Sequence, residues 1–565
     1  MIRRLLICLV VAAVFAPLTS RGDDFHDAQL DKGIRNSDYY AYLLLTQARQ
    51  RRAEAPEMLK QAVTDAPDLP AVHFALARQG FSWSGPGILA CIDHLVDGFN
   101  AYARNFWWSF TLWGALFFSL VLSFVVSFLV VVSVRLPRDI PLMTHDIKES
   151  PRRAIGLVLL VILSVISPLF LIAGILILIG IYMSRTDRSV VYTFLVFLIV
   201  LPLLLSFASF YISAPSSGTV KAVVQENESR GNAYALEALN GESGETASFS
   251  YALSLKREGH FQEAIDIYSR LSAKNQDPRI LVNLGNCYAG LYNFEEDKKG
   301  YLLDAVKFYS SAISSRPSAQ AYYNLSQVSR ELLEFAKGEE YFKNALTIDR
   351  AAVTGFRAIA SRQANRFVID ETVPEGELWS YAKSKSKDTF TFGLTLLPPA
   401  AIAVIAFVLL LIFALLPGRL RHTAYRCRKC GNVLCNRCER ELVVGQICSQ
   451  CYGSLLRLAE LDVKERVARI LSIYEQQKRR RDIIKVLSFI LPGASHVYAG
   501  KVLLGFLLLW PFLFCLAFPF VSAFFFPGSI LISHGVVGVG LVFLALIIYG
   551  VSNIITRQGL AKGWL

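Results

Sequence analysis

The most informative side chains are six cysteines in the last third of the chain. They form three Cys-x-x-Cys pairs within one short basic stretch: Cys427 and Cys430, Cys435 and Cys438, and Cys448 and Cys451. Two thiolates at this spacing can coordinate one metal ion from a tight turn, and two such pairs complete the tetrahedral shell that zinc prefers. Because cysteines fill every expected ligand position and the sequence has no His-Glu-x-x-His motif, the pattern predicts a closed structural site, not a catalytic one.

The spacing also suggests a shape for this region. Cys427-x-x-Cys430-Gly431 is typical of a metal knuckle, and the last pair precedes a helical run over residues 454–480. The pattern resembles a zinc-ribbon or treble-clef finger, which implies a zinc-binding module with a basic helix over residues 421–481. The middle pair exceeds what one ion needs and could hold a second ion with His422 or with a ligand that the sequence does not identify. A disulfide or redox cluster is the alternative, disfavoured by the surrounding basic residues.

Long apolar runs must position this module. The hydrophobic content of 53% and the mean hydropathy of +0.41 exceed what soluble domains carry, which indicates a polytopic membrane protein. The predicted membrane segments are 106–134, 154–183, 190–212, 392–416 and a two-span hairpin over 483–553 with apolar runs at 502–525 and 530–553. None of the apolar runs contains Asp, Glu, Lys or Arg. Transporters use ionisable groups inside the membrane, so a transporter is disfavoured.

A repeated spacing of small and large residues marks the region 213–390. One helix-turn-helix unit is indicated by Gly259, Phe261, Ala264 and Tyr268, a second by Leu284, Gly285, Tyr288, Ala305, Tyr309, Ala312 and Pro317, and a third by Leu325, Phe335, Gly338, Phe342 and Ala345. These residues resemble the tetratricopeptide repeat family, in which small residues let paired helices approach. The resemblance implies an α-solenoid. No unit has the full set, and Arg350 replaces the closing proline; a generic array of helical hairpins is the alternative.

The resemblance also implies a concave groove that binds a peptide or a helix. The candidate groove residues, on opening or facing helices, are Tyr268, Asn283, Tyr288, Asn324 and Arg330. Each of them could instead be a core or a solvated side chain. The shorter region 23–105 repeats the theme, because Ala55, Leu59, Ala62 and Pro67 match the second helix of such a unit. We therefore expect a second helical extracytoplasmic domain there.

Charge predicts which regions lie on which side of the membrane. Residues 1–22 have the basic start, short apolar run and small-residue exit of a signal peptide, with a retained anchor as the alternative. Lys and Arg number 15 against 7 Asp and Glu over residues 417–482, and 5 against 3 in a predicted loop at 135–153. Both repeat regions are slightly acidic. Positive loops stay in the cytoplasm, so the zinc module is predicted inside and the repeat regions outside.

Simple counting of crossings conflicts with that assignment unless one segment crosses twice. The segment 154–183 is the candidate: as one helix its 30 residues would reach about 45 Å, beyond the ~30 Å of hydrocarbon. Pro168 divides it into near-equal halves. We expect a hairpin that enters and leaves on the cytoplasmic face, and the opposite topology is the main alternative.

The last region has a pattern of its own. The sequence Leu-Pro-Gly-Ala-Ser-His-Val-Tyr-Ala-Gly-Lys at 491–501 precedes two spans and resembles a small two-span membrane family with a Pro-Gly turn. It predicts a tight turn at the interface, with His496 as a polar interface residue and Lys501 at the lipid head groups. The basic run 478–481 and the net charge of +13 are explained better by membrane lipids than by nucleic acid.

These features together predict a mainly α, polytopic helical membrane protein with an α-solenoid and a small zinc-stabilised module. The arrangement resembles bacterial inner-membrane proteins that combine tetratricopeptide-like repeats with a zinc-ribbon-like module, which implies a non-enzymatic scaffold that binds protein partners. The alternatives are a component of a transport, secretion or envelope-assembly complex and, less favoured, a membrane enzyme. No nucleotide-binding loop, Gly-x-Ser-x-Gly motif or site for a small-molecule substrate is evident in the sequence.

Overall fold

The protein is mainly helical and divides into two compact units. The computed structural model describes residues 21–149, 158, 161–162, 164–165, 167–231, 234–294, 299–386, 397–415, 424–427, 429–435, 447–456, 463–524 and 532–563. Unit 1 comprises Met1–Phe110 and Phe210–Lys387, and unit 2 comprises Thr111–Ser209 and Asp388–Leu565. The predicted signal peptide, apart from its last two residues, lies outside the described residues.

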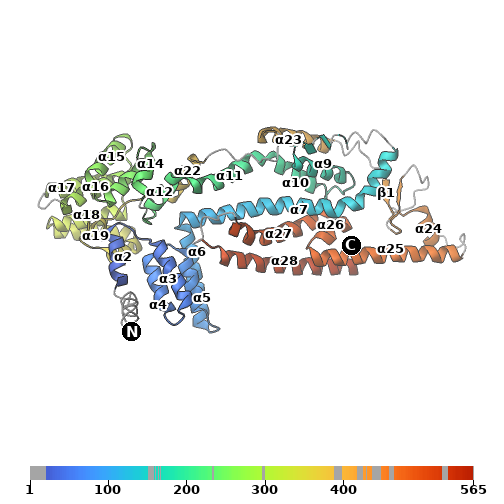
Figure 1. The fold of residues 1–565 in the computed structure, drawn as a ribbon, viewed down its shortest axis with the longest axis horizontal. Coiled ribbons are helices and arrows are strands. Elements are labelled where there is room, and N and C mark those ends of the chain that lie inside the picture. Colours follow the sequence, from blue (N-terminus) through green and yellow to red (C-terminus); the bar gives the residue numbers. More distant parts are fainter. Residues whose placement is uncertain are drawn as a thin grey trace, which may run out of the picture. The chain divides into compact units, whose positions relative to one another are not determined.

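The first part of unit 1 consists of short helices, of which the last four pack as two consecutive pairs (Figure 1). They are α2 (Arg21–Asp31), α3 (Asp38–Gln50), α4 (Ala55–Asp65), α5 (Pro70–Gly80) and α6 (Gly85–Ala103). Proline stands in the first turn of α4, α5 and α6, where its missing N–H costs no hydrogen bond. Ala55, Leu59 and Ala62 of α4 are buried, on the face that the repeat-like spacing predicts.

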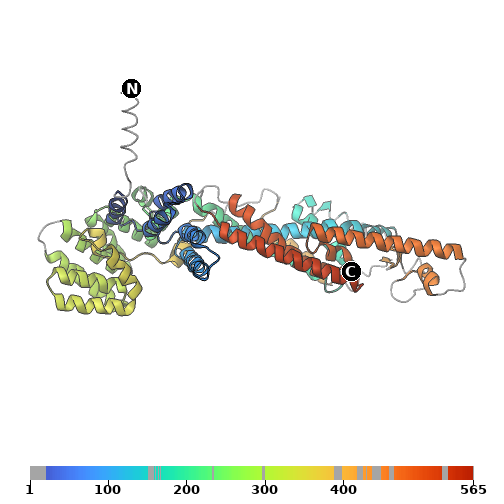
Figure 2. The ribbon, with the colours of Figure 1, turned by 90° about the horizontal axis from the view of Figure 1, so that it is seen from below.

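The second part of unit 1 is a longer series of helices. They are α12 (Gly218–Asn227), α13 (Ala235–Leu239), α14 (Glu245–Arg257), α15 (Phe261–Lys274), α16 (Pro278–Phe294), α17 (Lys299–Ser315), α18 (Ala319–Glu331), α19 (Phe335–Ile348), α20 (Arg350–Ile359), α21 (Ala364–Phe367) and α22 (Glu375–Ser384), after a 3-10 turn at Ala214–Ser216. From α14 to α20 each helix packs against the next (Figure 2).

Small residues let these helices approach closely. A Cβ on Gly285 of α16 would lie 2.6 Å from the ring of Tyr309 on α17, which is too close for any other residue. The buried aromatic and aliphatic side chains around this contact form one cluster with Ala305, Leu325 and Val328. The small and large residues that the sequence places at helix crossings therefore pack as partners here.

The two parts of unit 1 are joined by backbone and side-chain hydrogen bonds. The Asn36 N–H donates to the carbonyl of Ser229, and the Asn36 side chain donates to the carbonyl of Glu228. Arg366 pairs with Asp31 at 3.1 Å. Residues 23–105 and 213–387, which the sequence analysis treats as separate regions, therefore belong to one compact body.

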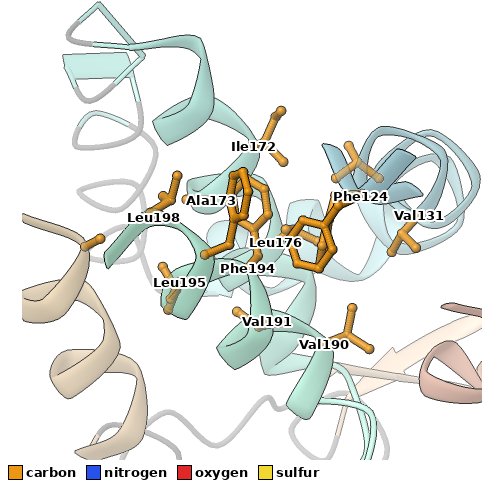
Figure 3. Packing of buried hydrophobic residues seen from close by; sticks show 14 of the residues in the cluster. Phe124, Val131, Ile172, Ala173, Leu176, Val190, Val191, Phe194, Leu195 and Leu198 are labelled. Atoms are coloured by element: carbon orange, nitrogen blue, oxygen red, sulfur yellow. The ribbon is translucent and has the colours of Figure 1, made fainter. Parts of the chain in front are cut away.

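Unit 2 contains the most apolar helices and the short sheet. It has most of α7 (Phe106–Glu149), then α9 (Pro168–Ile181), α10 (Ser189–Ile199), α11 (Leu201–Ser213), α23 (Pro399–Leu415), β1 (Ala424–Arg426), β2 (Val433–Cys435), α24 (Ser449–Leu456), α25 (Val463–Ile490), α26 (Ala494–Ala499), α27 (Val502–Phe524) and α28 (Gly535–Ala561). Figure 3 shows its core, in which Phe124 of α7, Leu176 of α9 and Phe194 of α10 pack together.

Among the residues that the structure describes, three helices are long and apolar enough to cross a membrane: Phe106–Asp146, Val502–Ala523 and Gly535–Ala561. They coincide with the predicted segments at 106–134 and in the hairpin region, where α27 and α28 pack side by side (Figure 1). The helices α9 and α23, in the predicted segments 154–183 and 392–416, are apolar but shorter, with 14 and 17 residues.

Helix α7 is longer than the first predicted span, which ends at residue 134. Residues 135–149, predicted as part of a loop, continue α7 as helix through Pro137 and Pro141. An ion pair between Arg135 and Asp139, at the i,i+4 spacing that helices favour, joins Nε and Oδ2 at 2.5 Å and is buried. This pair compensates two of the charges of the helical extension.

Prolines interrupt the next predicted segments. Helices α10 and α11 are long and apolar enough to cross a membrane only when they are taken together, and they meet at a bend of 56°. Pro202 at the start of α11 explains the break because proline has no N–H to donate to a helical hydrogen bond. Pro168 is the first residue of α9, which Ser167 caps by accepting from the Leu169 N–H. A break at Pro168 agrees with the prediction, whereas the hairpin itself stays a prediction.

The Pro-Gly turn before the last two spans depends on two glycines. Gly493 has a φ of +83°, and a Cβ there would lie 2.2 Å from the carbonyl oxygen of Gly505 on α27. Hydroxyl groups of α28 hold the turn: Ser552 accepts from the Gly493 N–H at 3.1 Å, and Thr556 lies 3.1 Å from Ser495. His496 is fully buried beside them, so it is an internal residue of this turn.

Candidate metal centre and groove

The cysteine region begins as a two-stranded antiparallel hairpin. Strands β1 and β2 pair Arg426 with Val433, and Cys427 and Asn432 close the turn through a hydrogen bond of 2.9 Å. Gly431 has a φ of +77°, a backbone conformation that glycine adopts at little cost. The turn therefore presents Cys427 and Cys430 from one knuckle, as the spacing predicts.

Four of the six cysteines come together. The sulfurs of Cys427, Cys430, Cys448 and Cys451 all lie within 4.8 Å of one another, and Cys430 and Cys448 are 3.8 Å apart. Four thiolates at the corners of a tetrahedron with metal–sulfur bonds of about 2.3 Å are separated by ~3.8 Å. All four are free thiols. The donor set and its size therefore fit one metal ion.

Backbone amides prepare this site for a cation. Burial raises the pKa of the Cys427 thiol, but the N–H groups of Cys448, Cys430 and Lys429 donate to its sulfur and lower the pKa to about 7. Burial raises the pKa of Cys448 to about 11. Only the thiolate binds a metal, so these cysteines must lose their protons when an ion binds.

The hairpin is fixed to the end of α7 beyond its apolar part. Asp146 accepts a hydrogen bond from the Ala424 N–H at 3.0 Å and another from the Tyr182 hydroxyl at 2.7 Å. Arg426 donates to the carbonyl of Arg138 at 2.7 Å. The candidate metal site is thus held on the part of α7 that is predicted to be a loop.

The middle cysteine pair is not part of the described cluster. Cys435 ends β2, where its backbone pairs with Ala424, and its side chain is not described. Cys438 and His422, the other components of a possible second site, lie outside the described residues. The helical run predicted after Cys451 consists of α24 and α25.

The predicted groove residues of unit 1 have different surroundings. Asn283 on α16 and Asn324 on α18 are fully buried and bind another part of the chain. The buried Tyr268 hydroxyl accepts from the Asn283 side chain at 3.1 Å. Tyr288 is half-buried and stacks on Phe308. The guanidinium of Arg330 lies over the ring of Phe342. Asn283 and Asn324 therefore form one binding element, with Tyr268 behind it.

That element binds an extended segment of the same chain, residues 368–374. Asn324 accepts from the Ile369 N–H at 2.7 Å and donates to its carbonyl at 2.8 Å. Asn283 makes the same two bonds with Glu371, both at 2.9 Å. Asn227 on α12 accepts from the Val373 N–H at 2.7 Å. Alternate residues of the segment are thus held through their main chain, with the period of two of a β-strand.

Further side chains fix the segment between the helices. Asn286 donates to the carbonyl of Ile369 at 2.9 Å and to Asp370 at 3.0 Å. Lys256 of α14 lies 2.9 Å from Asp370, and Arg257 lies 3.6 Å from it. Burial alone would raise the pKa of Asp370, but the charges of Lys256 and Arg257 outweigh it and lower the pKa. The aspartate is therefore ionised inside unit 1.

Sequence reasoning missed Asn227, Asn286, Lys256 and the whole segment 368–374. One signal was present: Asn283 and Asn324 both precede a leucine and a small residue, in Asn-Leu-Gly and Asn-Leu-Ser, so the same repeat position carries the same side chain. Nothing comparable marks Asn227 or the segment.

Comparison with known proteins adds no assignment. No protein-family model matches this chain, and no curated protein matches it.

Proposed function

We propose that this protein is a non-enzymatic membrane adaptor whose unit 1 binds protein partners through the groove lined by α12, α14, α16 and α18. The groove-bound segment 368–374 supports this most directly. Asparagines that pair with main-chain N–H and C=O groups recognise an extended chain through groups that every residue except proline has. A surface built in this way suits peptides and needs no catalytic group.

The repeat resemblance supports the same proposal. The helices of α14–α19 pack in sequence order, small residues stand at their crossings, and the groove-lining asparagines recur at one repeat position. We infer an α-solenoid of three tetratricopeptide-like units, with residues 23–105 as a further helical part.

The metal in unit 2 is proposed to be zinc in a structural role. Zinc prefers four thiolates in a tetrahedral arrangement, and a closed set of four cysteines offers no open position for a substrate. The zinc module would present a second interaction surface next to the basic helix α25. Its test is the metal content of the purified full chain, with one zinc per chain expected if the middle pair binds none.

Chain connectivity supports the topology that we propose. Unit 1 contains both Phe106 at the start of α7 and residues 210–387, and a unit that lies on one side of a membrane requires an even number of crossings between these two parts. Two crossings, by α7 and by the bent pair α10–α11, meet this condition. With the charge bias, this supports a multi-pass protein of the bacterial inner membrane with unit 1 in the periplasm and the zinc module in the cytoplasm.

Single cysteines introduced on each side test this topology in intact cells. Ser314→Cys in unit 1 should react with a membrane-impermeant thiol reagent above the wild-type level, and Ser472→Cys on α25 should not. Both side chains are exposed. Labelling of the second variant alone would invert the topology and place the groove in the cytoplasm.

The adaptor function is tested by co-purification of partners from membranes of the cell that makes the protein. The double variant Asn283→Ala and Asn324→Ala should lose the partners that the wild type retains, whereas Lys307→Ala, a change of an exposed residue on α17, should retain them. Equal membrane insertion of all three forms is the control. Partners that stay bound to the double variant at wild-type levels would contradict the proposal.

A further inference from the structure

The groove already holds a peptide, and this peptide is part of the chain. Residues 368–374 follow α21 and precede α22, with no helix of their own, and cross the inner helices from α18 toward α12. Main-chain groups of Ile369, Glu371 and Val373 occupy the asparagines. An external peptide cannot use Asn227, Asn283 or Asn324 until this segment leaves.

The side chains of the segment show which ligand chemistry the groove selects. Ile369 is buried with Tyr323 and Phe356 in an apolar cluster. Asp370 enters a cationic position between Lys256 and Arg257. These two positions favour an apolar residue followed directly by an aspartate.

The next residue is recognised as well. Glu371 accepts a hydrogen bond of 2.9 Å from Ser318, which caps the start of α18 through the Ala321 N–H. A carboxylate at a helix N-terminus is favoured by the helix dipole. The groove therefore fits an extended chain with an apolar–Asp–Glu core, and most of the affinity for other residues comes from main-chain bonds.

A cavity lies beside the segment. Its volume is about 380 Å³, and it is lined by Ile369, Asp370, Thr372 and Val373 on the segment and by Arg35 and Asn36 opposite, among others. This cavity is the place where we expect a competing chain to contact the segment first.

Attachment at both ends gives the resident segment an advantage. A short tether raises the effective concentration of a linked ligand to the millimolar range. A free peptide replaces the segment only when the ratio of its concentration to its Kd exceeds the ratio of the segment's effective concentration to the segment's own Kd. Weakening the resident segment should therefore strengthen the binding of an external copy.

We propose that residues 368–374 are an internal ligand that closes the groove, and that the partner which replaces them is an extended peptide with an apolar–Asp–Glu core. This rests on the proposed adaptor function of the same groove. The segment then gates partner binding: the groove is closed unless a partner is abundant or carries a better match.

A labelled peptide with the sequence of residues 365–377 tests the proposal on the full chain in lipid nanodiscs by fluorescence anisotropy. Ile369→Pro removes the N–H that donates a hydrogen bond to Asn324, so this variant should bind the peptide at least tenfold more tightly than the wild type. Thr372→Pro is the matched control, because among the described residues the Thr372 N–H has no hydrogen-bond partner, and it should bind as the wild type does.

Two further forms establish where and what the groove binds. Adding Asn283→Ala and Asn324→Ala to Ile369→Pro should abolish the gain, and a peptide with asparagine at the Asp370 position should bind at least tenfold more weakly. Equal affinity of the wild type and Ile369→Pro would overturn the gating. Loss of partners from the asparagine double variant would still uphold the adaptor function in that case.

A measurement on the unaltered chain covers the possibility that Ile369→Pro does not fold. With the protein labelled with ¹⁵N and an excess of unlabelled peptide, amide exchange of residues 368–374 of the protein should become at least tenfold faster while that of α16 stays unchanged. Exchange of the segment that does not respond to saturating peptide would overturn the proposal.

Discussion

The metal centre and the groove are both places where the chain surrounds a ligand, and they differ in where the ligand comes from. Three of the four clustered cysteines are buried, and the ion that their sulfurs are placed to hold would come from solution. The groove residues Asn283 and Asn324 are equally buried, but their partner is the chain itself. The first region therefore depends on its surroundings for its stability, whereas the second is complete after folding and has to be opened before it can bind.

Metal removal should give the largest effect and affect one region only. Structural zinc in small modules contributes about 10–16 kcal/mol of apparent binding free energy, so a strong chelator or Cys448→Ser should unfold β1, β2 and α24. The groove should keep its structure because the four clustered cysteines all belong to unit 2. Amide exchange resolved along the chain measures both regions at once, and exchange that rises in both would show that the two are coupled.

A broken charge pair should have the next largest effect, in the groove alone. Asp370→Ala leaves Lys256 buried without its closest partner, and removing one member of such a pair costs about 3–5 kcal/mol. The combined change Asp370→Leu and Lys256→Met should recover part of the loss, because the uncompensated charge disappears. Denaturant unfolding followed by a unit 1 probe measures the difference, and an unchanged midpoint for Asp370→Ala would contradict an ionised internal pair.

Loss of one asparagine should have a smaller effect of the same kind. Asn324→Ala removes one hydrogen-bond partner from the N–H and one from the C=O group of Ile369. Each buried group left without a partner lowers the free energy of unfolding by about 1–3 kcal/mol. Asn286 still reaches the carbonyl, so the net loss should lie near the lower end. The exposed Asn240→Ala is the control, and equal unfolding free energies for the two variants would argue against the asparagine contacts.

Acid should change the groove least, because opposing groups titrate. The pKa of Asp370 is lowered from its ordinary 3.8, so its contribution is present above that value and is lost as the pH falls below it. Burial raises the pKa values of Glu226 and Glu371, so their protonation favours the folded state as the pH falls. The Tm difference between wild type and Asp370→Asn isolates the aspartate and should shrink only below about pH 4.

The two regions also differ in how far the sequence predicts them. The four clustered cysteines lie within one short stretch, and ligand chemistry restricts their spacing, so residues and site could be predicted together. The middle pair looks the same in sequence, and no spacing rule says which pairs share an ion. Apolar runs predict spans for the same reason, since the membrane imposes a length, whereas the extension of α7 depends on the pairing of Arg135 with Asp139.

The groove depends on long-range contacts that leave no local pattern. Asn283 and Asn324 could be chosen as candidates because a repeat puts equivalent residues at equivalent positions. Their ligand comes from residues 368–374, which have no repeat and no motif, and Asn227 lies about 146 positions before its partner Val373. A polar side chain that binds main chain imposes no requirement on the partner's sequence, so the partner could not be recognised.

The most direct test of the account is the amide exchange of residues 369–373 in the unaltered full chain. We predict alternation: the amides of Ile369, Glu371 and Val373, which donate to asparagines, should exchange at least tenfold more slowly than those of Asp370 and Thr372. Uniformly fast exchange over these five residues would show that the segment does not occupy the groove, and would contradict the account.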